Sequence, residues 1–301
     1  MSNLPIPLLL CISLTASTGM ATLQTFFMKR KKAAAFDAYL YTLVVSLVCA
    51  ILIAVLFGRG MTFSPLTVLL GALFGLASLS QQVLISLALR LGPLSSTNTI
   101  CCMGAILSAF TGVLFFNEDL TPVMVIGIIL MVFCFLFAVK KESDEQKKKA
   151  SIKWLLAVSG GCLASTAVGC LQKVHQESAV SGELYSMLLV SFLVGIVGAV
   201  PFVLVGMKRE KGEESMRELL KPLLPALPLA LFAGVGSATC NVINLYLIGA
   251  MNSAVIFPLF NGTALILTIL IGCLIFRERL TRRQWVGIGV GLVATVRLGF
   301  G

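Results

Sequence analysis

The sequence predicts an all-α polytopic membrane protein with ten transmembrane helices, arranged as two inverted five-helix repeats. Three observations predict this fold. Hydrophobic residues make up 58% of the chain and charged residues only 12%, a composition far from that of soluble domains. The basic residues gather in alternate loops, and the two halves of the chain share short motifs.

Apolar segments separated by charges, prolines and polar glycine-rich turns predict the spans. A helix needs about 20 apolar residues to cross the hydrocarbon core. Between Pro222 and Phe276 there is no Asp, Glu, Lys or Arg, which leaves room for two spans. The last span contains Arg297, which must reach an interface, and Trp285 is its aromatic anchor at the other end. The predicted spans are residues 7–27, 39–58, 65–89, 95–116, 122–139, 153–174, 184–206, 223–248, 253–275 and 284–300.

The basic residues predict the orientation. In a ten-span chain, the loops after the odd-numbered spans share one side, and they hold nearly all of the Lys and Arg; the other side holds only Arg59, Lys173 and Arg297. The positive-inside rule then predicts a multi-pass protein of the cytoplasmic (plasma) membrane with both termini outside. Because the net charge of +10 is explained by these loops, the expected partner is the lipid bilayer and not nucleic acid.

Two motifs occur once in each half of the chain. Residues 16–24 (ASTGMATLQ) return as residues 164–172 (ASTAVGCLQ), with five of nine positions identical. Residues 116–121 (FNEDLT) return as residues 276–281 (FRERLT). The same order and similar separation of both pairs indicate duplication of a unit.

The duplicated unit contains five helices, an odd number, so its second copy must enter the membrane from the opposite side. Inverted repeats of this kind surround a central site that can open alternately to each side of the membrane. The predicted division is a first repeat over residues 1–140, a cytoplasmic basic linker over 141–152 and a second repeat over 153–301.

Each half ends in a Glu-x-Leu-Thr turn, at Glu118 and Glu278, followed by a glycine-bearing span. This pattern resembles the EamA-type ten-helix members of the drug/metabolite transporter (DMT) superfamily over essentially the whole chain. The resemblance implies a transporter of amino acids, nucleosides, vitamins, sugar derivatives or amphipathic drugs. It also gives Pro258 a structural role, as the proline of the last-but-one helix of a half. The first half has Cys101-Cys102-Met103-Gly104 in place of that proline.

The acidic residues avoid the middle of the membrane, since all thirteen fall at span ends or in loops. An ionisable residue at mid-depth would mark an ion or proton path. Its absence favours a substrate that is neutral, zwitterionic or amphipathic. One histidine and no paired buried acids argue against an enzyme, and we expect no cofactor and no metal site.

Polar side chains within the spans are the candidate substrate ligands, because amides both donate and accept hydrogen bonds. Hydrogen bonds between helices are the competing interpretation of each of them. Gln82 and Asn241 are the leading candidates, since they lie at mid-depth on equivalent helices of the two repeats. The candidates are Gln82, Asn241, Thr18, Thr166, Gln81, Asn244, Asn98 and Asn261.

Residues at the span ends receive other assignments. Gln24 and Gln172 are candidate gate residues, although capping of helix ends explains them as well. We expect Glu118 and Glu278 to be structural, facing water and binding neighbouring helix N-termini. The only histidine, His175, is expected to be solvated at an interface.

Glycine pairs four residues apart, Gly71 with Gly75 and Gly287 with Gly291, predict close helix packing. Taken together, the sequence predicts a secondary transporter that moves a small solute by alternating access. The alternative from another class is a non-transporting membrane protein that acts as a structural or assembly partner.

Overall fold

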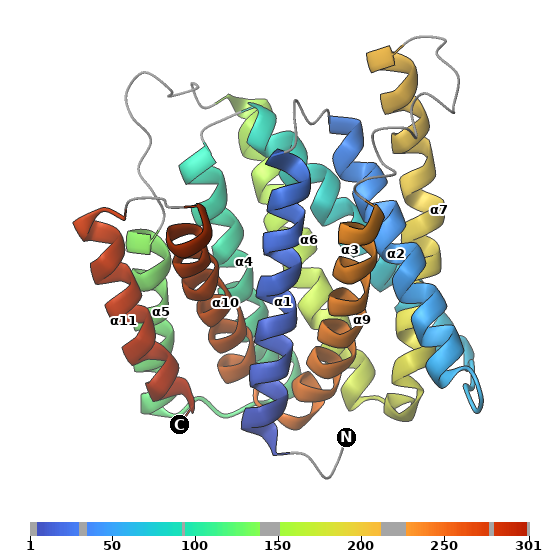
Figure 1. Cartoon of the computed structure of the whole chain (residues 1–301). Coiled ribbons are helices and arrows are strands. Elements are labelled where there is room, and N and C mark those ends of the chain that lie inside the picture. Colours follow the sequence, from blue (N-terminus) through green and yellow to red (C-terminus); the bar gives the residue numbers. More distant parts are fainter. Residues whose placement is uncertain are drawn as a thin grey trace. The chain divides into compact units, whose positions relative to one another are not determined.

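The computed structural model describes residues 5–29, 35–91, 94–138, 151–211, 227–276 and 280–299. Ten α-helices account for most of these residues (Figure 1). A short 3₁₀ helix, η2 (Ser181–Glu183), precedes the seventh α-helix. The α-helices are α1 (Ile6–Lys29), α2 (Ala35–Phe57), α3 (Pro65–Leu91), α4 (Leu94–Phe116), α5 (Pro122–Ala138), α6 (Ile152–Glu177), α7 (Leu184–Lys211), α9 (Leu227–Ala250), α10 (Ser253–Phe276) and α11 (Arg282–Gly299).

The predicted fold class is confirmed, because each predicted span coincides with one of these helices. Within the described ranges, six helices are long and apolar enough to cross a membrane. Shorter apolar stretches lie at Ile6–Met20, Gly104–Phe116 and Pro122–Phe137. The predicted eighth span differs at its start, since α9 begins at Leu227 and the residues just before it lie outside the described part.

The chain divides into two compact units, and each takes helices from both halves of the sequence. The first unit comprises Met1–Leu79 and Ala179–Asn244, and the second comprises Ser80–Ser178 and Leu245–Gly301. The predicted repeats, 1–140 and 153–301, and the linker 141–152 between them stay predictions about sequence duplication.

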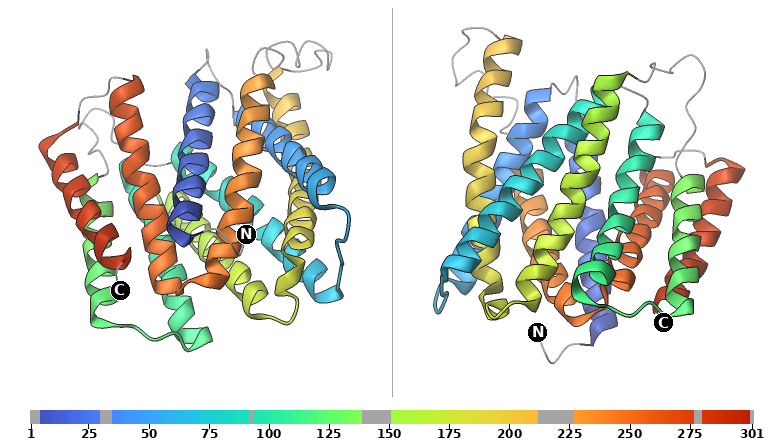
Figure 2. Two further views of the ribbon diagram at one scale, coloured as in Figure 1. Left: turned by 60° about the horizontal axis from the view of Figure 1, so that its bottom comes forward. Right: turned by 180° about the vertical axis from the view of Figure 1, so that it is seen from behind.

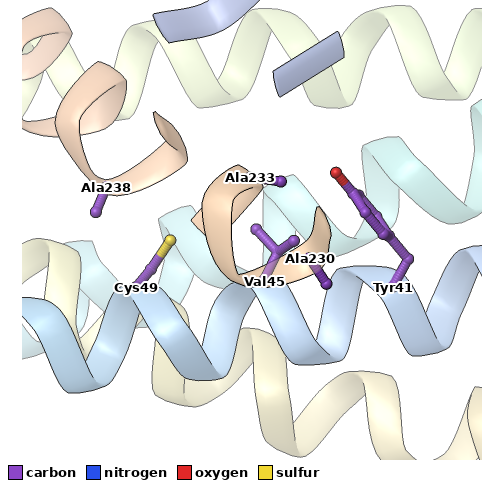
Figure 3. Packing of buried hydrophobic residues seen from close by; sticks show 6 residues of the cluster. All are labelled: Tyr41, Val45, Cys49, Ala230, Ala233 and Ala238. Atoms are coloured by element: carbon purple, nitrogen blue, oxygen red, sulfur yellow. The ribbon is translucent and has the colours of Figure 1, made fainter. Parts of the chain in front are cut away.

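In the first unit, α2 packs against α7, and the two helices run side by side in Figure 2. A buried apolar cluster joins α2 to α9, with only small side chains on α9 (Figure 3). The close approach needs such residues: a Cβ added to Gly234 would lie 2.6 Å from the Val48 Cβ atom. The cluster consists of Tyr41, Val45, Cys49, Ala230, Ala233 and Ala238.

The glycines of α3 confirm the prediction of close packing. A Cβ on Gly71 would lie 2.8 Å from the Met187 carbonyl oxygen, and one on Gly75 would lie 2.6 Å from the Ser191 carbonyl oxygen. Any larger side chain would therefore push α3 away from α7. At the end of this contact, Glu183 Oε2 accepts hydrogen bonds from the Ser64 backbone N–H and from Ser64 Oγ, both at 2.9 Å.

In the second unit, α4 packs against α6 and α10, and α5 packs against α11 (Figures 1 and 2). Gly291 of α11 faces α5 closely, since an added Cβ would lie 2.5 Å from Cys134 Sγ. The start of α6 is fixed by its Ser151 cap and by Trp154, whose indole Nε1–H donates to Thr97 Oγ1 of α4 at 2.9 Å.

Candidate functional site

A group of uncharged polar side chains lies between α1 and α9 in the first unit. The Ser13 hydroxyl, fully buried on α1, donates to Asn244 Oδ1 at 2.8 Å. It also approaches Cys240 Sγ at 3.6 Å, and Asn244 Nδ2 donates to the same sulfur at 3.6 Å. A hydroxyl, an amide and a thiol thus join the two helices. We call Ser13, Ser237, Cys240, Asn241 and Asn244 the α1–α9 polar group.

The other members of this group bind within one helix. Asn241 Nδ2 donates to the Ser237 carbonyl oxygen at 2.8 Å and to Ser237 Oγ at 3.3 Å. Thr18, on α1, is buried and donates to the Leu14 carbonyl oxygen of its own helix at 2.7 Å. The contact between helices is made by Ser13, which the sequence analysis did not select. In the sequence, the only indication of this contact is the hydroxyl group of Ser13 within an apolar helix.

A second set of polar side chains lies between α4 and α6 in the second unit. Thr166 Oγ1 lies 3.1 Å from the Cys162 carbonyl oxygen and 3.4 Å from the Gly104 carbonyl oxygen of α4. Ser108 Oγ donates to that same Gly104 oxygen at 3.0 Å. A Cβ on Gly104 would lie 3.2 Å from Ser165, so Gly104 lets the two helices meet at these hydroxyls.

The remaining candidate ligands are placed as follows. On α3, Gln81 is half-buried and Gln82 is exposed. Asn261 is exposed on α10 and donates to the Phe257 carbonyl oxygen at 2.9 Å. Asn98 lies on α4, and its side chain is outside the described part. Gln82 and Asn241 belong to different units, and their place at mid-depth on equivalent helices of the two repeats stays a prediction.

Of the candidate gate and structural residues, some lie within the described part of the chain and others lie outside it. Gln172 is buried on α6, whereas the side chain of Gln24, on α1, is outside the described part. Pro258 lies inside α10 and is buried, where its ring removes one backbone donor from the helix. Glu278 lies outside the described residues. The roles assigned to these four residues stay predictions.

A buried ion pair lies at the turn between α9 and α10, and sequence analysis missed it. Lys173 Nζ, on α6, lies 2.8 Å from Glu118 Oε1, and the two side chains are 4% and 11% exposed. The other carboxylate oxygen, Glu118 Oε2, accepts from the Ser253 backbone N–H at the start of α10, at 2.9 Å. We call this pair and its backbone partners the Lys173–Glu118 clasp.

The Lys173 ammonium also binds the end of α9. Its Nζ donates to the carbonyl oxygens of Ile248 and Met251, at 3.1 and 3.3 Å. Glu177 Oε1, from the next turn of α6, lies 3.0 Å away and is half-exposed. A buried charge requires such partners, because an unpaired ion in an apolar interior is strongly unfavourable. The signal in the sequence was Lys173 itself, a basic residue inside an apolar span on the side that is poor in basic residues.

Two expectations about this region are wrong. Glu118 does not face water, because the Lys173 ammonium and the Ser253 N–H occupy the carboxylate in place of water. His175 is not solvated either, since it is fully buried. The cause is the close packing of the end of α6 on α9, where a Cβ on Gly249 would lie 2.7 Å from Gln176 Oε1.

Among the described residues, no group of three or more His, Cys, Asp or Glu side chains is placed to hold a metal ion. The α1–α9 polar group offers donors and acceptors without a formal charge, while the clasp has its charges fully paired. Such a set of groups can bind a polar, uncharged ligand and fix helix ends.

Comparison with known proteins agrees with this fold. One solved structure, described as "Crystal structure of protein", has the same fold at a TM-score of 0.69 and 12% identity, covering 97% of this chain and 98% of the other. No curated protein has a similar sequence. The apolar helices define a multi-pass α-helical membrane protein.

Residues 152–299 match the EamA-like transporter family, and the predicted resemblance to the drug/metabolite transporter superfamily is confirmed. The second half of the chain is an EamA-like transporter domain, which supports a membrane transporter of the drug/metabolite type.

Proposed function

We propose that this protein is a secondary transporter that moves a small neutral, zwitterionic or amphipathic metabolite across the cytoplasmic membrane by alternating access. The solute class is that of an amino acid, a nucleoside, a vitamin or a drug-like molecule. The observation that carries the proposal is the α1–α9 polar group, which offers hydroxyl, amide and thiol groups on helices of an EamA-like transporter.

The neutrality of this group supports the solute class. Amides and hydroxyls can satisfy both the donors and the acceptors of a polar ligand. A fully charged ligand would need a counter-ion at depth, and the described charged pair, Lys173 with Glu118, is already saturated at a helix end. The solute therefore has no net charge that the site must neutralise. Alternatively, it is an amphipathic molecule whose charged group stays near a membrane interface.

Asn241, Asn244 and Thr18 are then the proposed ligands of the first unit, and the remaining candidates are those of the second, with Gln24 and Gln172 as gates. The hydrogen bond from Ser13 to Asn244 orients the amide on α9. The orientation proposed from the basic loops, with both termini outside, makes the α6 end the outer end of its span.

Thermal unfolding of the purified protein tests this proposal directly. The panel contains amino acids, nucleosides, vitamins and amphipathic cations. A ligand present at about 100 times its dissociation constant stabilises the protein by about 2.7 kcal/mol. We expect one class to raise the melting temperature and the others to leave it unchanged.

Variants then connect the hit to the site. Asn244→Ala and Asn241→Ala should abolish the ligand-induced shift, and Gln82→Ala should reduce it. Thr239→Ala is the matched control, since Thr239 is on α9 and its hydroxyl binds the Val235 carbonyl oxygen of the same helix. If no class stabilises the folded protein, the alternative of a structural or assembly partner is favoured over a transporter.

A further inference from the structure

The Lys173–Glu118 clasp connects the two halves of the sequence inside one compact unit. Glu118 follows α4 and belongs to the first predicted repeat, whereas Lys173 and Ser253 belong to the second. Any motion of one half against the other at this end of the helices must therefore act on this ion pair. The alternating access described above requires such a motion.

The clasp binds both helices of the α9–α10 turn at their polar ends. Lys173 donates to carbonyl oxygens at the end of α9, which carries partial negative charge. Glu118 accepts from the N–H group at the start of α10, which carries partial positive charge. Asn252, within the turn, adds a hydrogen bond from Nδ2 to the Asp119 carbonyl oxygen at 3.2 Å.

The surroundings leave the clasp little room to deform gradually. A Cβ on Gly112 of α4 would collide with Glu118 Oε2 and would lie 2.5 Å from the Ser253 Cβ atom. Tightly packed contacts of this kind switch between discrete arrangements and do not stretch continuously. The ion pair is therefore either formed, with its charges paired and buried, or separated, with its charges in water.

The two halves of the chain are not equivalent at this position. In the register that aligns Gln24 with Gln172, the position of Lys173 is occupied by Thr25 in the first half. The first repeat therefore has no lysine at the position equivalent to Lys173. Only the second repeat has a lysine at this position. A clasp of this kind is therefore expected on one face of the membrane only.

We propose that the Lys173–Glu118 clasp is a latch that keeps one face of the transporter closed and separates each time that face opens. The inference rests on the proposed transport function. On the orientation given above, the latched face is the outer one. The latch biases the resting protein toward the state that is closed on this face, because the opposite face lacks the lysine.

Cys170 provides a native reporter for this latch. It lies on α6 one turn before Lys173, is half-buried, and is a free cysteine. Residues three apart on a helix lie on the same face, so water that passes the separated clasp reaches the Cys170 thiol. A small, charged, membrane-impermeant thiol reagent should therefore modify Cys170 faster when the latch is open, and peptide mass spectrometry identifies the modified residue.

The experiment uses the full-length protein in vesicles without any solute. We expect Lys173→Met to raise the modification rate of Cys170 by roughly tenfold, the change in open population for a shift of about 1.4 kcal/mol in a two-state equilibrium. Glu118→Gln should raise the rate in the same direction but less, because its amide oxygen still accepts from the Ser253 N–H. Lys153→Met, an exposed lysine on the same helix, is the control and should leave the rate unchanged.

Two outcomes decide the proposal. An unchanged rate in both Lys173→Met and Glu118→Gln, with the helical circular dichroism of the unaltered protein, would show that the pair is structural and not a latch. If Lys173→Met does not fold, the milder Glu118→Gln variant decides alone. Because no solute is present, this result is independent of the ligand panel. If the modification rate of Cys170 changes but no ligand of the panel stabilises the protein, the opening motion is supported and only the proposed solute class is contradicted.

Discussion

Two glutamates bind the N-terminus of a helix, one in each compact unit, and they do so in different surroundings. Glu183 accepts from the backbone N–H and the hydroxyl of Ser64 at the start of α3, and it is half-buried. Glu118 accepts from the Ser253 N–H at the start of α10, and it is paired with Lys173 in a largely buried position. A carboxylate near water is satisfied by neutral donors, whereas a buried one requires a counter-ion.

The comparison predicts that removal of Lys173 has the largest effect on stability. Lys173→Met leaves the Glu118 carboxylate buried without its counter-ion, and the loss of one partner from a buried pair costs about 3–5 kcal/mol. Thermal unfolding in detergent measures the change. Lys153→Met should stay within about 0.5 kcal/mol, as expected for an exposed site. A small effect of Lys173→Met would mean that water reaches Glu118 freely.

The glycine beside Glu118 is predicted to have the next largest effect. Gly112→Ala places a methyl group against Glu118 Oε2 and Ser253, and overpacking of this kind costs about 1–3 kcal/mol. Gly289→Ala, on α11 of the same unit, is the matched control, because an added Cβ there has no atom within 4 Å. The same unfolding assay compares them. Equal effects of the two substitutions would contradict the packing described around the clasp.

The polar group between α1 and α9 is predicted to contribute less to stability than to ligand binding. Ser13→Ala removes the hydrogen bond to Asn244 Oδ1, and such bonds between membrane helices average about 0.6 kcal/mol. The same substitution should reduce the ligand-induced rise in melting temperature by a much larger fraction than it reduces the stability of the ligand-free protein. If Ser13→Ala lowers stability strongly but leaves ligand binding intact, the α1–α9 polar group is a packing element.

The smallest change is expected at Glu183. Glu183→Gln keeps an oxygen that can accept from the Ser64 N–H and hydroxyl, so no ion is left unpaired. We expect the melting temperature to fall by less than it does in Glu118→Gln, measured side by side. The reverse order would overturn the distinction between the two glutamates.

The helices could be predicted from the sequence with good accuracy, because the bilayer requires long apolar segments bounded by charges. The prolines at Pro65 and Pro122 mark helix starts to the residue, whereas α7 continues through its basic residues to Lys211, past the predicted end at 206. Gly71 and Gly75 predicted close packing of α3, because only small side chains permit such an approach; the structure shows that the partner is α7.

The partners of polar residues could not be predicted in this way. The sequence places Lys173 near the end of a predicted span but does not show its counter-ion, because Glu118 is distant in the sequence and is brought to it only by the meeting of α4 and α6. Ser13 was passed over because its hydroxyl gains importance only from the register of α1 against Asn244. His175 was expected in water because the packing of the α6 end on α9 is invisible in the sequence of α6 alone.

The central claim is that the protein carries a small neutral, zwitterionic or amphipathic solute by alternating access. Solute counterflow in proteoliposomes tests it most directly, with the labelled compound that stabilises the protein outside and the unlabelled compound inside. We predict transient accumulation of label, which Asn244→Ala removes and Thr239→Ala retains. Absence of accumulation for every stabilising compound, with the protein folded and inserted, would contradict transport by alternating access.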